Sequence, residues 1–218
     1  RIITNRPDTD EFSAGYDLEV NGIRNGGWGQ AGEGYVNIPL SDRVAVRVVG
    51  WAEHEGGYID NQRGTRQYLT SGVLDDNFDI AKNDYNTVNT YGGRIALGID
   101  LNDSWTITPQ IMGQNQESHG VFAQQSDVGE LAVTHFFPEF NKDVWAQGAL
   151  TIEGQVSNFD VVFAASYLTR DVDSNQDYAD YGFFYDTFLG YGSYFTDNAF
   201  NPINPAQQVE GNDHFNRK

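Results

Sequence analysis

Three very short turns join long stretches in which apolar and polar residues alternate. The turns lie at 40–44, 101–105 and 156–159, and each is built around Ser, Asp or Asn residues. The connections at the other ends of the stretches are long, at roughly 55–90, 117–142 and 171 onward. Short turns at one end and long loops at the other are typical of an up-and-down antiparallel meander. Segments that are neighbours in sequence are therefore expected to be neighbours in one sheet.

Each alternating stretch presents an apolar face and a more polar face. In 94–101, Ile95 and Ile99 alternate with Arg94 and Asp100, and alternate residues of a strand point to opposite faces. The pattern predicts about seven strands, near 12–22, 31–40, 44–54, 91–101, 105–116, 144–156 and 159–170. We expect an outward apolar face that includes Ile95, Leu97, Ile99, Ile107, Ile111, Leu150, Ile152, Val161 and Phe163. We expect the opposite face to include Arg94, Gln110, Gln114, Gln147, Glu153 and Asp160.

The apolar face could cover a soluble core or face lipid, because alternation alone is common to both kinds of sheet. The stretches run about 9–13 residues, longer than the roughly 5–6 of a soluble strand and near the 9–11 of a tilted membrane strand. Aromatic residues such as Tyr91, Trp105 and Phe159 stand at the ends of stretches, where an interfacial girdle places them. These two features favour an all-β fold of the transmembrane β-barrel type.

Composition excludes several other classes of protein. The chain has 218 residues, a net charge of -18 and a pI near 4.3, which argues against nucleic-acid phosphate as a partner. It has no cysteine, so disulfides and thiolate sites are excluded. No cofactor is expected. The chain opens on strand-like residues and stops near 216–218 within an expected loop, so we interpret it as an internal piece of a longer protein with no visible signal peptide.

Several segments resemble one family. The sequence at 2–7 resembles the end of the plug domain of TonB-dependent outer-membrane receptors, where the plug crosses into the barrel. The sequence at 37–47 resembles their second and third barrel strands with the periplasmic turn between them, and 56–61 resembles the segment that comes after that third strand. The sequences at 149–154 and 181–186 look like a proteobacterial subgroup of these receptors.

The resemblance implies a barrel of about 22 strands with an N-terminal plug in its lumen. Residues 1–10 would be the end of the plug and the crossover, and 11–218 the N-terminal part of the barrel with its long external loops. Such receptors sit in the bacterial outer membrane and actively import a scarce small-molecule ligand, such as an iron chelate, cobalamin or an oligosaccharide. The implied partners are outer-membrane lipid, the rest of the barrel and plug, and TonB, which grips an N-terminal segment missing from this sequence. The alternative from another class is a soluble all-β carbohydrate-binding or calcium-dependent adhesion module.

The aromatic stretch at 178–195 is the strongest candidate for a ligand site. Its rings could stack on a sugar or a chelate, or could instead pack loop against loop. The candidate ligand-binding residues are Tyr181, Phe184, Tyr185, Tyr191 and Tyr194. Asp75, Asn77 and Asp79 form a weak calcium candidate, because they alternate like an EF-hand loop but lack its glycine and its final glutamate. No catalytic motif is present, so we expect a protein that is not an enzyme.

Overall fold

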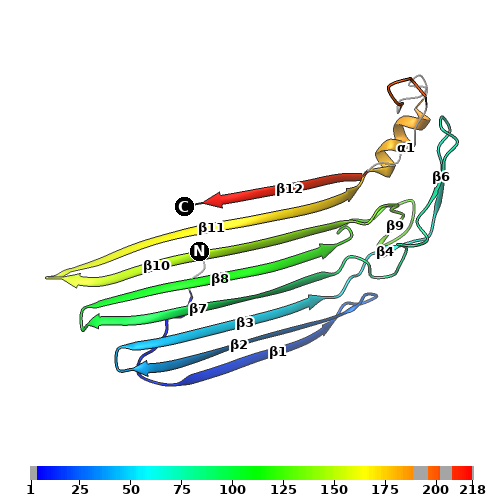
Figure 1. The fold of residues 1–218 in the computed structure, drawn as a ribbon. Helices are drawn as coiled ribbons and strands as arrows, with labels where there is room; N and C mark the ends of the chain where they lie inside the picture. The colour runs from blue at the N-terminus through cyan, green and yellow to red at the C-terminus, as the bar shows by residue number, and fades with distance from the viewer. Residues whose placement is uncertain (1–3, 189–195, 202–207, 218) are drawn as a thin grey trace.

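The fold is dominated by one eight-stranded antiparallel sheet with the order β1-β2-β3-β7-β8-β10-β11-β12 (Figure 1). The computed structural model of the protein describes residues 4–188, 196–201 and 208–217. The strands of the sheet are β1 (Ser13–Gly22), β2 (Trp28–Ser41), β3 (Val44–Glu55), β7 (Val88–Asn102), β8 (Trp105–His119), β10 (Phe140–Val156), β11 (Phe159–Asp177) and β12 (Gln208–Arg217). The sequential antiparallel meander predicted from the sequence is confirmed.

The tight turns lie where the sequence predicts them. Ser157 adopts a left-handed φ of 56° in the turn between β10 and β11, as very short hairpin turns require. The strands extend further at the loop ends than expected, and β11 continues to Asp177. Residues 171–177 lack apolar alternation, but their backbone is held by pairing with β10 and β12.

Strand β12 is not predicted by the sequence pattern, and the expectation that the chain ends in a loop is wrong for residues 208–217. These residues pair with Leu168–Asp177 of β11. Residues 159–167 of β11 pair with β10 alone within the part of the chain that the structure describes. The sheet is not closed into a barrel there, and β1 and β12 are its two edges.

The segment before β1 crosses one face of the sheet, which we call the inner face (Figure 1). Asn37 donates from its side-chain amide to the backbone oxygens of Asp8 and Glu11 at 2.9 Å. Arg6 forms an ion pair with Glu153 on the same face. The segment before β1 therefore contacts the inner face of the sheet, and its assignment to the end of a plug stays a prediction.

The opposite face, which we call the outer face, is apolar and exposed. Apolar residues of neighbouring strands lie side by side on this face: Ile111 lies opposite Ile95, and Ile152 lies opposite both Ile107 and Phe163. Exposed members of this face include Tyr16, Leu18, Val20, Ile38, Leu40, Ile95, Leu101, Ile111, Val156, Phe159, Val161 and Phe163. The predicted division of the strands into two faces is therefore confirmed.

The small hydrophobic core lies among the loops at the end of the sheet opposite the tight turns. Ile59, Tyr85 and Val133 form its centre, and Tyr58, Val121 and Leu131 pack around them. The loops contain the parallel pair β4 (Asp60–Asn61) and β9 (Ala132–Val133), the hairpin β5 (Thr65–Gln67) and β6 (Leu74–Asp76), and the helix α1 (Ala179–Thr187). Figure 1 shows these elements gathered together at one end. In the described ranges, no helix has the length and apolar character needed to cross a membrane.

Candidate functional site

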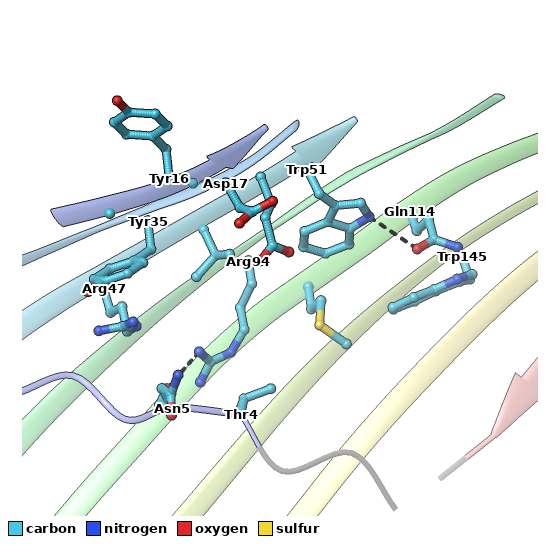
Figure 2. Close-up of a pocket in the computed structure, with 15 residues that line it drawn as sticks. Thr4, Asn5, Tyr16, Asp17, Tyr35, Arg47, Trp51, Arg94, Gln114 and Trp145 are labelled. Atoms are coloured by element: carbon cyan, nitrogen blue, oxygen red, sulfur yellow. Dashed lines mark hydrogen bonds between the residues drawn. The ribbon is translucent and has the colours of Figure 1, made fainter. Parts of the chain in front are cut away.

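A cavity of about 560 Å³ lies on the inner face, with Thr4 and Asn5 of the N-terminal segment in its lining (Figure 2). Its volume falls within the usual range of about 300–1,000 Å³ for small-molecule sites. The remaining lining residues include Gly15, Asp17, Glu33, Gly34, Tyr35, Arg47, Val49, Trp51, Arg94, Met112, Gln114 and Trp145. Tyr16 also borders the cavity, but its ring points away from it, on the outer face (Figure 2). Besides the N-terminal segment, the cavity therefore involves six neighbouring strands of the sheet, from β1 to β10.

The strand register explains why these side chains meet. Arg47, Val49 and Trp51 alternate along β3, so all three point to the inner face. Arg94 lies opposite Val49 on one side and opposite Met112 on the other. The sequence pattern assigns these positions to the more polar faces, and the two tryptophans on such faces are the signal in the sequence that could have pointed to this cavity.

Aromatic rings and two arginines make up much of the lining of the cavity. The indole nitrogen of Trp51 donates to the side-chain oxygen of Gln114 at 3.2 Å, which fixes the ring at the edge of the cavity beside Trp145 (Figure 2). Arg94 donates from Nε to Gln110 at 2.7 Å and from Nη1 to the backbone oxygen of Asn5 at 2.9 Å. These groups suit a ligand that combines a flat or apolar part with hydrogen-bond acceptors.

The predicted aromatic ligand residues lie elsewhere, on the helix α1. Tyr181, Phe184 and Tyr185 share one face of this helix, where the Tyr181 and Tyr185 rings meet edge to face with centroids 4.7 Å apart. Tyr181 and Phe184 are exposed. Tyr191 and Tyr194 lie outside the described residues. Tyr181, Phe184 and Tyr185 do not line the inner cavity, so their rings form a separate surface.

The opposite face of α1 docks on the β5–β6 hairpin, which explains why the segment is helical. Asp186 accepts a hydrogen bond from the backbone amide of Leu69 at 2.6 Å and also binds Thr70. The ring of Tyr68, which is fully buried, meets Phe183 edge to face with centroids 5.8 Å apart. Burial raises the pKa of Tyr68 to about 12. The sequence analysis assigns this segment to a loop, and that assignment is wrong for Ala179–Thr187, which are helical.

Of the weak calcium candidates, Asn77 has a structural role. Its side chain is 2% exposed, donates to the backbone oxygens of Gln62 and His135 at 2.8 and 3.0 Å, and accepts from the amide of Gly64 at 2.8 Å. Asp75 lies opposite Arg66 in the hairpin, and Asp79 is exposed. Within the ranges that the structure covers, no group of three or more His, Asp or Glu side chains could hold a metal ion.

A buried polar cluster ties the β9 loop to the end of β11. His135 lies 2.6 Å from a carboxylate oxygen of Glu139, and Tyr85 donates to the same oxygen at 3.2 Å. Burial opposes the charge of His135, but the hydrogen bond and charge of Glu139, assisted by Asp177, raise the pKa of His135 above its ordinary value. Burial also raises the pKa values of Asp177 and Tyr85. The loops at this end of the sheet therefore depend on several titratable groups.

No known protein-family model matches this sequence, and no curated protein or solved structure is significantly similar to it. The function therefore has to be argued from the residues and their arrangement.

Proposed function

We propose that the chain is the N-terminal third of the barrel of a TonB-dependent outer-membrane receptor, with residues 1–10 as the end of its plug. The observation that carries this proposal is that the sheet exposes its apolar face and buries polar side chains on the other face. Its outer face exposes a row of large apolar side chains, and Tyr16 and Ile111 on it are 82% and 69% exposed. Its inner face holds buried polar side chains such as Asn37 and Arg94.

This polarity suits lipid on the outside and a polar lumen on the inside. Soluble monomers rarely expose contiguous apolar patches larger than a few hundred Å². Membrane barrels, by contrast, alternate apolar residues toward lipid with polar residues toward the lumen. The proposal also accounts for the two uneven ends of the sheet, with tight turns on the periplasmic side and long packed loops outside. The open edges at β1 and β12 would pair with further strands of the same barrel, because unpaired backbone groups are costly in hydrocarbon.

The inner cavity and the loops supply the parts that ligand uptake needs. The loops meet at one end of the sheet, and the aromatic face of α1 is exposed there to an approaching ligand. The cavity lies further along the inner face and is lined partly by the N-terminal segment, so a movement of this segment would alter the cavity. Active import of an iron chelate, cobalamin or an oligosaccharide, driven by TonB through the plug, is the activity that this arrangement best supports.

A soluble carbohydrate-binding module is the second candidate, and the exposed rings on α1 favour it. Aromatic side chains that present a bare face can stack on sugars without any membrane. This second function does not account for the apolar outer face, which is why we rank it lower.

Membrane fractionation tests the proposal. The full-length protein would be produced in a Gram-negative host, and its outer membranes would be washed with alkaline carbonate before extraction with detergent. We expect the protein to stay in the washed outer membrane and to dissolve only in detergent. Release by carbonate into a soluble, folded form would refute membrane insertion and would favour the soluble module.

Uptake assays then test the transport step separately. Hosts that carry the protein would be grown on limiting iron chelates, cobalamin or oligosaccharides, with TonB intact or deleted. Growth that requires both the protein and TonB is expected for one ligand class. A protein that inserts in the membrane but supports growth equally well without TonB would contradict the energised mechanism and leave a passive pore.

A further inference from the structure

Arg47 is 9% exposed, and its Nε is buried. Among the residues that the structure describes, this Nε has no hydrogen-bond partner and no carboxylate forms an ion pair with Arg47. In the described part of the chain, the guanidinium lies over the ring of Tyr35, whose centroid is 3.9 Å from the guanidinium carbon. A ring face attracts a cation, but it replaces only part of the hydration that a buried guanidinium loses. An anion bound beside Arg47 would compensate for the rest of the lost hydration.

Arg94 adds a second buried positive charge to the same cavity. It is 4% exposed, and its hydrogen bonds to Asn5 and Gln110 both end on neutral oxygens. The charges of Arg94 and Arg47 repel each other. Asp17 and Glu33 also line the cavity, but neither forms an ion pair with the two arginines among the described residues. Neither acid therefore supplies a direct hydrogen-bond acceptor to the two guanidinium groups.

We propose that Arg47 and Arg94 form a binding site for a carboxylate whose attached group is flat and apolar. A guanidinium presents its donors in a planar fork that matches the two oxygens of a carboxylate. Tyr35, Trp51 and Trp145 provide ring surfaces in the same cavity for the attached group. The carboxylate can come from a free small molecule or from an Asp or Glu side chain of a polypeptide segment on the inner face.

The carboxylate site deepens the proposed function, because such a ligand would be the cargo of the receptor or part of its plug. It does not depend on that function, since an anion can bind to the inner face whether or not transport occurs. Membrane fractionation reports on insertion, whereas ligand titration reports on the charge selectivity of the cavity, so the two can fail separately.

Calorimetric titration of the full-length protein in detergent with indole-3-acetate and indole-3-acetamide tests the free-ligand source. The two probes have the same ring and nearly the same size, but only the acetate is charged. We expect the acetate to bind at least about tenfold more tightly, as hydrogen bonds between charged groups imply. Arg47→Gln should remove this preference. Arg43→Gln, which changes an exposed arginine in a tight turn, should preserve it.

An experimental structure of the full-length protein, obtained without added carboxylates, tests the polypeptide source. If a side-chain carboxylate occupies the site, its oxygens should lie within hydrogen-bonding distance of Arg47, and neither probe should bind differently from the other. Either the charge preference that requires Arg47 or this side-chain contact supports the proposal. Equal binding of the two probes together with no carboxylate at Arg47 would overturn it.

Discussion

The loss of unfolding free energy caused by Ile111→Arg should show whether the outer face of the sheet contacts lipid or water. Ile111 lies near the middle of β8, is 69% exposed, and stands opposite Ile95 and Gly148 on the outer face. An arginine at mid-bilayer on the outside of a barrel costs about 2–4 kcal/mol. An exposed surface substitution in water changes stability by no more than about 0.5 kcal/mol. The side chain has few contacts to lose, so the surrounding medium determines the outcome.

Two control variants separate the effect of the face from the effect of the depth in the membrane. Gln147 is the neighbour of Gly148 and lies at nearly the same depth on the inner face, so Gln147→Arg should cost less than about 1 kcal/mol. Val156 lies on the outer face at the turn end of β10, where an arginine should cost only about 0–1 kcal/mol.

The measurement is reversible urea unfolding of the protein in phospholipid vesicles, followed by the fluorescence of its 4 tryptophans. We expect the loss of unfolding free energy to be large for Ile111→Arg and small for both controls. Equal losses at Ile111 and Gln147 would refute the assignment of the faces. A negligible loss at Ile111 would refute contact with lipid.

Three further predictions concern the loops at the end of the sheet opposite the tight turns. Asn77→Ala removes the four side-chain hydrogen bonds of this buried residue and should destabilise the loops locally by roughly 2–4 kcal/mol, seen as faster amide exchange, whereas Asp79→Ala at an exposed neighbour should change little. Asp186→Ala should release α1 from the hairpin at 65–76 and speed proteolysis there, since roughly 2–4 kcal/mol of docking energy is lost; unchanged cleavage would contradict the docking. The raised pKa of His135 means that its stabilising contribution is complete below about pH 6.5 and is lost as the pH rises through the raised value. The protection of the amides after His135, measured relative to their intrinsic exchange rates, should therefore be greater at pH 6 than at pH 8.5, and His135→Gln should remove this difference in protection.

The meander could be predicted because short stretches of sequence determine its turns and the faces of its strands. Ser41, Asn102 and Ser157 mark turns by their residue types, and the alternation between the turns determines which side chains share a face. Strand β12 and helix α1 could not be predicted in this way. The sequence of 208–217 has no apolar alternation, and its strand depends on backbone pairing with β11. The helix depends on Asp186 and Phe183 meeting a distant hairpin.

The inner cavity could not be predicted from the sequence for a similar reason. Arg47 and Arg94 lie on different strands, and only the register across β3 and β7 brings them into one cavity. The N-terminal segment contributes Thr4 and Asn5, which no periodic pattern places there. The aromatic residues at 178–195 stand out by their number, whereas Trp51 and Trp145 are single residues on otherwise polar faces.

A cysteine scan along β10 tests most directly whether the outer face contacts lipid, which is the central claim. The chain has no native cysteine, so each substitution from 145 to 154 gives a unique site for a spin label. A lipid-facing outer surface predicts a period of two, in which labels at 146, 148, 150, 152 and 154 meet oxygen dissolved in lipid. Labels at 145, 147, 149, 151 and 153 should instead be shielded from lipid on the polar inner face. Labels at the first set of positions that are reached by a water-soluble relaxation agent and not by lipid-dissolved oxygen would contradict this claim.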